Sequence, residues 1–311
     1  MDHKIRVELA IRHLPVDQIP CAELVIDDAV VQQGLCGEKV INFEHRLEFV
    51  RTMGLDAVCL HPEFCLQPDC IPLAQDAVFA DLEQWAKTDY FIFALLDGPI
   101  GWGVKLLGFN QLMVKLARRH PDILMLMKDI ERLNINIMEK LRHSGVNGVI
   151  IADDIAFNQG VIVRPDILRQ TLFPALARQV ESAKAFDLPV FFHADGNLML
   201  VMEDIVEAGF DGLQCIESVA GMDIELIKRQ YGQKLCLWGN LDPAELVMER
   251  SSSQLQNKVN NIINAAGGHD GGLIFGTSSG LFEGIRLENL KHVYESVRKS
   301  LVTQGNVTEE I

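Results

Sequence analysis

A histidine and an aspartate separated by one residue, His193 and Asp195, have the types and the spacing to do chemistry. They lie in PVFFHADGN (189–197), where an apolar run leads into a turn that contains glycine. Such a run predicts a buried strand, and in parallel α/β folds ligands bind at the carboxyl ends of the strands. An imidazole and a carboxylate at that position could hold a metal ion or move a proton. The simpler alternative is that His193 is a hydrogen-bonded structural residue.

Polar residues also end the other apolar runs of the sequence. The doublet Asp153–Asp154 follows the run 148–152. Because side chains alternate across a strand, one carboxylate is expected to face the axis of the fold and its neighbour to cap a helix. Asp242 precedes a proline, so the alternative to a functional role is that it caps the next helix. The full set at the other run ends is His61, Asp97, Glu217, Asn240, Asp242, Ser278 and Ser279.

About eight apolar runs, most of them followed by a helical pattern, must position these residues. Near-continuous apolar strands indicate burial on both faces, which is typical of a parallel sheet. Strand–helix alternation of this length favours a closed (β/α)8 TIM barrel, an α/β fold, over an open doubly wound sheet. We predict one barrel domain over residues 1–311, with a short N-terminal lead-in and a frayed C-terminal tail from 303. The strands are expected at 23–26, 57–60, 90–96, 148–152, 189–193, 212–216, 235–238 and 271–275.

The composition disfavours several classes of partner. The chain has 311 residues, of which 43 are acidic and 28 basic, and its net charge of −15 argues against binding to nucleic acid or to an anionic membrane. No segment reaches the roughly 20 uninterrupted apolar residues of a spanning helix. The N-terminus MDHKIRVELA has no apolar signal core, so we expect a cytoplasmic protein. No glycine-rich nucleotide-binding motif follows a predicted strand.

The seven cysteines are an odd number and form no CxxC pair, which predicts reduced thiols. Cys59, Cys215 and Cys236 lie inside apolar runs. We therefore interpret these three as packing residues of the core.

Four segments of the sequence carry a resemblance to a known family. They are GVNGVIIADDIAFNQGVIVRPDILRQTLFPAL (145–176), PVFFHADGN (189–197), LCLWGNLDPAELV (235–247) and GGLIFGTSSGLFEGIRLENLKHVYESV (271–297). These segments resemble the uroporphyrinogen decarboxylase superfamily, which contains the tetrapyrrole decarboxylase and methyltransferases that work with corrinoid proteins. The acidic doublet, followed by a helix that begins with proline, is closer to the methyltransferase branch.

The N-terminal region departs from the decarboxylase branch of that family. The decarboxylases begin with an arginine-rich stretch that grips the carboxylates of the substrate, whereas this region offers only Arg6 and Arg12. A substrate with many carboxylates needs bidentate arginine partners. Uroporphyrinogen is therefore a poor fit.

The expected zinc motif also differs. Thiol-activating methyltransferases of the superfamily use a His-x-Cys pair after the strand that corresponds to 189–193, and a further cysteine near the last strand. Here the first motif reads His193-Ala194-Asp195, and Ser278-Ser279 stands where the second cysteine is expected. Histidine with carboxylates forms a harder and weaker zinc site than one with thiolates.

The resemblance implies a methyltransferase that moves a methyl group from a small methylated compound, a methoxy-aromatic or a methylamine, to a corrinoid carried on a partner protein. On this hypothesis His193, Asp195, Asp154 and Asn240 are catalytic, because a poor leaving group needs a proton or a Lewis acid. A Zn²⁺ ion would be held by His193, Asp195 and Glu217. A homodimer is also compatible with the sequence. Substrate contacts are expected from Asp97, His61, Asp153, Asp242, Ser278 and Ser279.

Two other functions are compatible with the sequence. The first is decarboxylation of uroporphyrinogen, in which a carboxylate such as Asp97 or Glu63 would stabilise a protonated ring intermediate, as the resemblance implies. The second is a non-catalytic barrel that binds a corrinoid protein, which agrees with the loss of both cysteines of the zinc motif. The polar residues kept at so many strand ends favour an enzyme over the binding protein.

Overall fold

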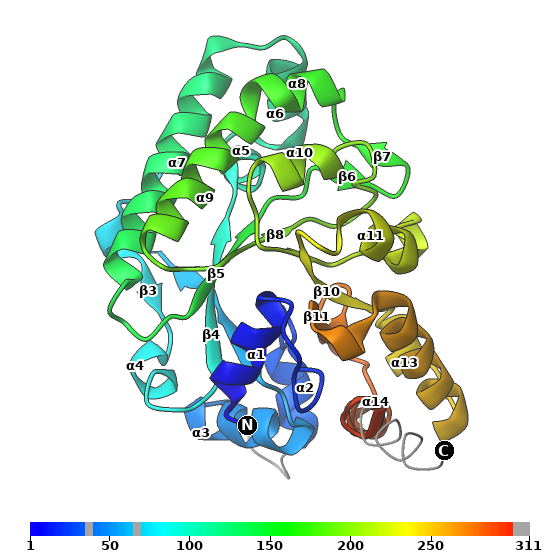
Figure 1. The fold of residues 1–311 in the computed structure, drawn as a ribbon. Coiled ribbons are helices and arrows are strands. Elements are labelled where there is room, and N and C mark those ends of the chain that lie inside the picture. Colours follow the sequence, from blue (N-terminus) through cyan, green and yellow to red (C-terminus); the bar gives the residue numbers. More distant parts are fainter. Residues whose placement is uncertain (35–39, 65–69, 301–311) are drawn as a thin grey trace.

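The protein forms a curled parallel sheet with helices on its outer side (Figure 1). The computed structural model describes residues 1–34, 40–64 and 70–300. Seven strands pair in parallel in the order β1-β4-β5-β8-β9-β10-β11. Their bounds are β1 Ala57–Leu60, β4 Phe91–Asp97, β5 Gly148–Ala152, β8 Val190–His193, β9 Gly212–Gln214, β10 Cys236–Leu241 and β11 Leu273–Thr277.

A short segment of the N-terminal region closes the sheet into a ring. Cys21 forms a parallel bridge with Phe275 of β11, and Ala22 forms one with Ala57 of β1. The backbone hydrogen bonds are Ala22 N to Phe275 O at 2.9 Å and Asp56 N to Cys21 O at 2.6 Å. This segment takes the place of the eighth strand, and the predicted (β/α)8 TIM barrel is confirmed.

The eighth strand lies slightly earlier in the chain than the predicted 23–26 and is limited to single bridges. Side chains form hydrogen bonds with backbone groups that a longer ladder would pair with each other. Trp238 Nε1 donates to Ala22 O at 3.0 Å, and the Thr277 N–H donates to the carboxylate of Glu23 at 3.0 Å. The ladder therefore breaks directly after Ala22.

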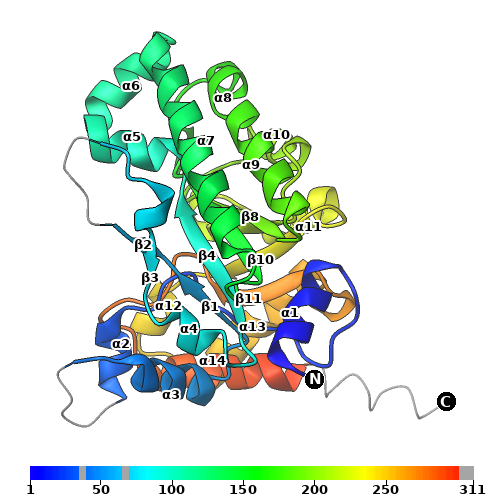
Figure 2. The ribbon, with the colours of Figure 1, turned by 90° about the vertical axis from the view of Figure 1, so that its left-hand side faces the viewer.

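The helices between the strands form the outer layer, and α7 and α9 lie side by side on it (Figures 1 and 2). No helix of the described part of the chain is long and apolar enough to cross a membrane. Two short hairpins, β2 Pro62–Glu63 with β3 Val78–Phe79 and β6 Ala156–Phe157 with β7 Gly160–Val161, follow β1 and β5. The helices are α1 His3–Ile11, α2 Asp28–Gln33, α3 Phe43–Met53, α4 Leu82–Trp85, α5 Pro99–Leu107, α6 Phe109–Ala117, α7 Pro121–Leu141, α8 Pro165–Thr171, α9 Phe173–Ala185, α10 Met202–Glu207, α11 Ile224–Tyr231, α12 Ala244–Val247, α13 Ser252–Ala266 and α14 Leu287–Ser300.

The interior of the barrel is filled with aromatic side chains. Phe93 packs against Phe191 and Trp238, with ring centroids 5.4 and 5.2 Å apart. All three side chains are fully buried. Aromatic packing of this kind makes the barrel a solid core and not a pore, so chemistry is confined to the ends of the strands.

The predicted N-terminal lead-in contains a helix, α1, that covers the amino end of the barrel. The Gly272 N–H donates to Ala10 O at 2.9 Å, just before β11 begins, and Lys4 N donates to Asp89 O at 3.1 Å. Asp2 caps α1 by accepting from the Lys4 N–H. The predicted frayed tail from residue 303 lies outside the described residues.

Candidate functional site

The strand register aligns one row of residues at the carboxyl end of the barrel. Asp97 pairs with Ala152, Ala152 with His193, His193 with Gln214, and Gln214 with Trp238. Trp238 is fully buried and belongs to the aromatic interior. Polar residues that follow this row by one to three positions therefore gather above the aromatic core, at the mouth of the barrel.

His193 is oriented by a hydrogen bond from its Nδ1. Gln214 Nε2 donates to Ser278 O at 3.3 Å, which turns Gln214 Oε1 toward the imidazole. Because this oxygen only accepts, Nδ1 of His193 carries the hydrogen. Nε2 is then the free nitrogen, and it lies 3.9 Å from Asp154 Oδ1, beyond hydrogen-bond range. His193 therefore presents one available ring nitrogen to the mouth of the barrel.

Two carboxylates lie close to this nitrogen, and a third lies beside one of them. Ligand atoms of Asp154, His193 and Asp195 lie within 4.8 Å of one another. Asp154 Oδ1 accepts from the Asp195 N–H at 3.0 Å, and Glu217 Oε2 accepts from the Gly196 N–H at 2.8 Å. The ends of β5, β8 and β9 thus place Asp154, His193 and Asp195 in one group, with Glu217 beside Asp195.

The group has an uncompensated negative charge. In the described ranges no lysine or arginine forms an ion pair with Asp154, Asp195 or Glu217, and His193 at 3.9 Å is the only basic group paired with Asp154. Carboxylates held this close repel one another unless a cation or a proton lies between them. The arrangement therefore favours a metal ion or a positively charged substrate.

Cys215 belongs to this group, although its sequence context predicts a core residue. Its thiol donates to Asp195 Oδ1 at 3.2 Å, and ligand atoms of Asp195, Cys215 and Glu217 lie within 4.8 Å of one another. Burial, reinforced by Asp195, raises the pKa of the Cys215 thiol. Asn240 is next to it, since its Nδ2 donates to Ile216 O at 3.1 Å. Asn240 thus holds the backbone between Cys215 and Glu217 rather than projecting into the group.

The acidic doublet divides as its sequence predicts. Asp154 faces the mouth, and Asp153 turns to the helix layer, where its Oδ1 accepts from the Gly101 N–H of α5 at 2.9 Å. Asp153 Oδ2 is buried without a partner, and burial raises the pKa of this carboxyl well above its usual range. Asp153 is therefore a buried helix cap, which argues against the substrate contact expected of it.

Asp97 and His61 form a second polar group, on the β1 and β4 side of the mouth. Asp97 Oδ2 lies 3.2 Å from His61 Nε2 and 2.5 Å from Lys105 Nζ. Burial acts to raise the pKa of Asp97, but the hydrogen bonds from His61 and Lys105 outweigh it, and the net pKa is lowered. Asp97 is ionised and neutralised by its neighbours. Lys105, eight residues along on α5, gave no signal in the sequence.

The remaining residues predicted to contact the substrate are Asp242, Ser278 and Ser279. Asp242 and Ser278 have structural roles. Asp242 Oδ1 accepts from the Ala244 N–H at 2.9 Å, so this side chain caps α12, as its alternative interpretation holds. Ser278 is buried and its N–H donates to Leu241 O at 2.9 Å, whereas Ser279 is exposed. These contacts argue against direct substrate binding by Asp242 and Ser278.

Comparison with known proteins identifies the family. A model of the family described as uroporphyrinogen decarboxylase (URO-D) matches residues 82–300, more than two thirds of the chain. The chain belongs to the uroporphyrinogen decarboxylase family. A search of curated proteins finds no significant match to this sequence.

Two solved structures share the fold of this URO-D family member. A methyltransferase from Methanosarcina mazei is 19% identical with a TM-score of 0.75, and the similarity covers 96% of this chain and 98% of that one. A B12-independent methionine synthase from Shewanella sp. W3-18-1, in complex with selenomethionine, is 12% identical with a TM-score of 0.54, and covers 94% and 96%. At these identities the similarity establishes the fold alone.

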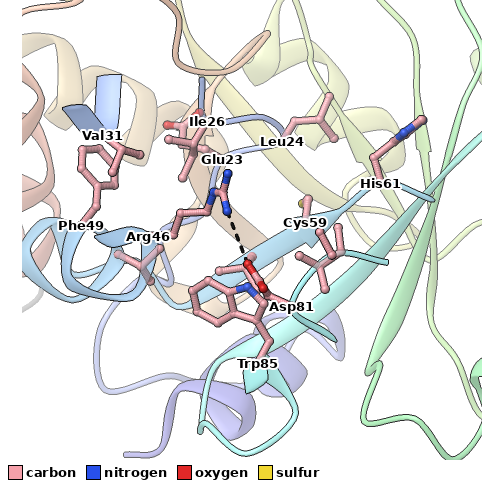
Figure 3. Close-up of a pocket in the computed structure, with 14 residues that line it drawn as sticks. Glu23, Leu24, Ile26, Val31, Arg46, Phe49, Cys59, His61, Asp81 and Trp85 are labelled. Carbon is pink, nitrogen blue, oxygen red and sulfur yellow. Dashed lines mark hydrogen bonds and ion pairs between the residues drawn. The ribbon is translucent and has the colours of Figure 1, made fainter. Parts of the chain in front are cut away.

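An apolar cavity of about 150 Å³ lies beside the barrel, lined mostly by residues that precede the URO-D match (Figure 3). Leu24, Val31, Phe49 and Trp85 contribute apolar walls, and His61 also lines it. The Arg46–Asp81 ion pair, 3.4 Å long, lies on the wall of the cavity. The cavity shares no residue with the group around His193, so it is a separate feature of this chain.

Glu23 lines the same cavity and makes the stability of the fold sensitive to pH. Burial raises the pKa of Glu23 to about 7, although hydrogen bonds from Thr277 and Tyr294 act to lower it. A carboxyl whose pKa is raised in the folded state binds its proton more tightly there, so its contribution is complete below pH 4 and is lost as the pH rises to 7.

We expect the free energy of unfolding to fall by about 3 kcal/mol between pH 5 and pH 8 from this group alone. In Glu23→Gln, which cannot ionise, that share of the fall should disappear. Urea unfolding at several pH values measures it. An identical pH dependence in the variant and the wild type would show that Glu23 does not titrate in this range.

Proposed function

We propose that this protein is a methyltransferase that takes a methyl group from a small methylated amine or ether and passes it to a corrinoid on a separate protein. The observation that carries the proposal is a group of three carboxylates, Asp154, Asp195 and Glu217, in which Asp154 and Asp195 lie beside the available Nε2 of His193. A methyltransferase is among the solved structures of similar fold, which agrees with this proposal.

The charge of the site selects among substrates. Three carboxylates without a lysine or arginine partner in the described residues repel a polycarboxylate and attract a cation. Of the two donor classes, methylamines carry a positive charge at neutral pH and methoxy-aromatics do not. The structure therefore favours a methylammonium donor over an ether.

The two arginines of the N-terminal region do not support the decarboxylase alternative. Arg6 is buried at the amino end of the barrel, where it pairs with Asp17 at 2.7 Å and Asp56 at 2.5 Å, and Arg12 ends the same helix. Chemistry in this fold takes place at the other end of the strands. The two arginines of the N-terminal region are thus not available to bind a substrate at the mouth.

The reaction requires that the methyl group leave nitrogen or oxygen without its bonding electrons. The Co(I) of the corrinoid supplies an electron pair to the methyl carbon and becomes Co(III), and the electrons of the broken bond stay on the departing atom. A quaternary ammonium leaves as a neutral amine, whereas an ether oxygen needs a proton. A protonated His193 could deliver that proton from Nε2, because Nδ1 is held by Gln214.

The donor set also fits a zinc ion. Zinc in proteins is bound by imidazole nitrogen, carboxylate oxygen and thiolate sulfur, all of which are present here. His193 and Asp195 would hold it together with Asp154, the third member of their set, whereas Glu217 belongs to the set of Asp195 and Cys215. When bound, zinc supplies a Lewis acid for the departing atom. Gln214 would then fix the ring of His193 through Nδ1, as outer hydrogen bonds commonly do for ligating histidines.

Methyl transfer to free cobalamin tests the proposal. The purified protein is mixed with chemically reduced cobalamin and, separately, with methylamines and methoxy-aromatics, and methylcobalamin is followed by its visible absorbance. We expect formation from at least one methylamine. Failure with every donor, together with conversion of uroporphyrinogen to coproporphyrinogen, would favour the decarboxylase over the methyltransferase.

A further inference from the structure

The cavity beside the barrel has an apolar interior and a polar rim (Figure 3). Its inner walls include Val31, Phe49 and Trp85, whose exposed fractions are 2%, 6% and 3%. Arg46 and Asp81 also line it, but their side chains are 34% and 28% exposed. Apolar walls with a few polar groups are typical of sites for small molecules. The cavity therefore has the composition of a ligand site.

The charged groups of the rim pair with one another across three elements. Arg46 of α3 donates to both carboxylate oxygens of Asp28 on α2 at 2.9 Å. It also pairs with Asp81, just before α4, at 3.4 Å, along the dashed line of Figure 3. Two carboxylates share this one guanidinium, so the rim does not favour an anionic ligand.

Glu23 and His61, which also line the cavity, have partners of their own. The carboxyl of Glu23 accepts from the Thr277 N–H at 3.0 Å and from the Tyr294 hydroxyl. His61 Nε2 lies 3.2 Å from Asp97 Oδ2. A buried water molecule needs roughly two to four polar partners, and a buried ion needs a counter-charge. The cavity therefore favours a neutral apolar molecule over water or an ion.

The walls and the volume favour a single aromatic ring. Phe49 of α3 and Trp85 of α4 both line the cavity. Trp85 is held in place by edge contacts with Phe43 and Tyr90, at centroid distances of 5.0 and 6.1 Å. Aromatic rings gain energy from offset or edge-to-face contacts beyond the area that they bury. A volume of about 150 Å³ suits one molecule of the size of benzene.

We propose that this cavity binds one small, neutral aromatic molecule of about the size of benzene, through apolar contacts with its walls. The site shares no residue with the group around His193, so the inference does not depend on the proposed methyl transfer. His61 is common to the cavity and to the polar group that it forms with Asp97. The ligand site therefore adjoins the mouth of the barrel on the side of β1.

Titration of the full-length protein with fluorobenzene, followed by ¹⁹F NMR, tests the proposal. We expect one saturable site. The anion 4-fluorobenzoate and the cation tetramethylammonium, added as competitors, should bind at least about tenfold more weakly than fluorobenzene. A wild-type protein that does not bind fluorobenzene overturns the proposal. Displacement of fluorobenzene by either ion at an equal or lower concentration overturns the assignment of a neutral ligand.

Two variants that fill the cavity locate the bound molecule. Val31→Phe enlarges an inner wall, and Ala80→Phe enlarges an exposed lining residue, so the second can fold even if the first does not. Each folded variant should bind fluorobenzene at least about tenfold more weakly than the wild type. Val114→Phe, the same change at an exposed position of α6 outside the lining, should bind with wild-type affinity.

His193→Gln distinguishes the cavity from the site at the mouth. His193 does not line the cavity, so this variant should bind fluorobenzene as the wild type does. Loss of binding in His193→Gln, or wild-type affinity in a folded Val31→Phe or Ala80→Phe protein, would place the ligand elsewhere and overturn the proposal.

Discussion

Replacement of His193 by glutamine is expected to lower kcat/KM for methyl transfer by about 10²- to 10⁴-fold. Glutamine has nearly the same volume, but it has no imidazole nitrogen to face Asp154 and Asp195. Both candidate roles of His193, as a metal ligand and as a proton donor to the leaving group, require that nitrogen. The measurement is the initial rate of methylcobalamin formation at several concentrations of the methyl donor.

The matched control for this prediction is His143→Gln. His143 is exposed, just beyond the end of α7, and makes no contact with the site group. This variant should have wild-type kinetics. If His193→Gln kept its activity within a few-fold of wild type while remaining folded, His193 would be the structural residue of the simpler alternative.

The second large effect concerns stability, at the opposite end of the barrel. Asp56 is fully buried, and it accepts from Arg6 at 2.5 Å, from His3 at 2.7 Å and from the Cys21 N–H at 2.8 Å. Asp56→Ala leaves a buried guanidinium and a buried N–H without this partner. Because Arg6 still pairs with Asp17, we expect a loss at the lower end of the usual range for a broken buried ion pair, about 3 kcal/mol.

Urea unfolding of Asp56→Ala measures this loss as a shift of the midpoint at constant slope. Asp129→Ala, which removes a surface pair with Arg132, is the control and should have nearly the midpoint of the wild type. A fall of less than about 1 kcal/mol in the free energy of unfolding of Asp56→Ala would mean that the buried pair stabilises the fold no more than a surface pair does. Below its unfolding range the variant should retain methyl transfer, because Asp56 lies away from the mouth.

The sequence predicts the barrel well because each strand is marked by a local pattern of residues. Each buried strand of a parallel sheet is a continuous apolar run, and its end is marked by the first polar residue, as at His193 and Asp154. The exception is the segment that closes the ring, where Trp238 and Glu23 replace backbone pairing. That contact joins residues more than 200 positions apart, so no local pattern could reveal it.

The site is only partly predictable for a similar reason. Alternation along a strand correctly divides Asp153 from Asp154, and convergence of parallel strands brings Glu217 to His193. The sequence predicts a core residue at Cys215, which lies inside an apolar run and is indeed buried. What places its thiol beside Asp195 is the left-handed backbone at 215 and 216, which non-glycine residues rarely adopt and which the sequence does not signal.

We infer that His193 and its carboxylates form a site for breaking a bond to a methyl group. The most direct measurement follows an isotopically labelled methyl group from a methylamine to cobalt by mass spectrometry of the cobalamin product, with wild type and His193→Gln in parallel. The claim predicts labelled methylcobalamin in an amount equal to the demethylated amine, with almost none from the variant. Equal labelling by both proteins, or by neither while the wild type decarboxylates uroporphyrinogen, would contradict it.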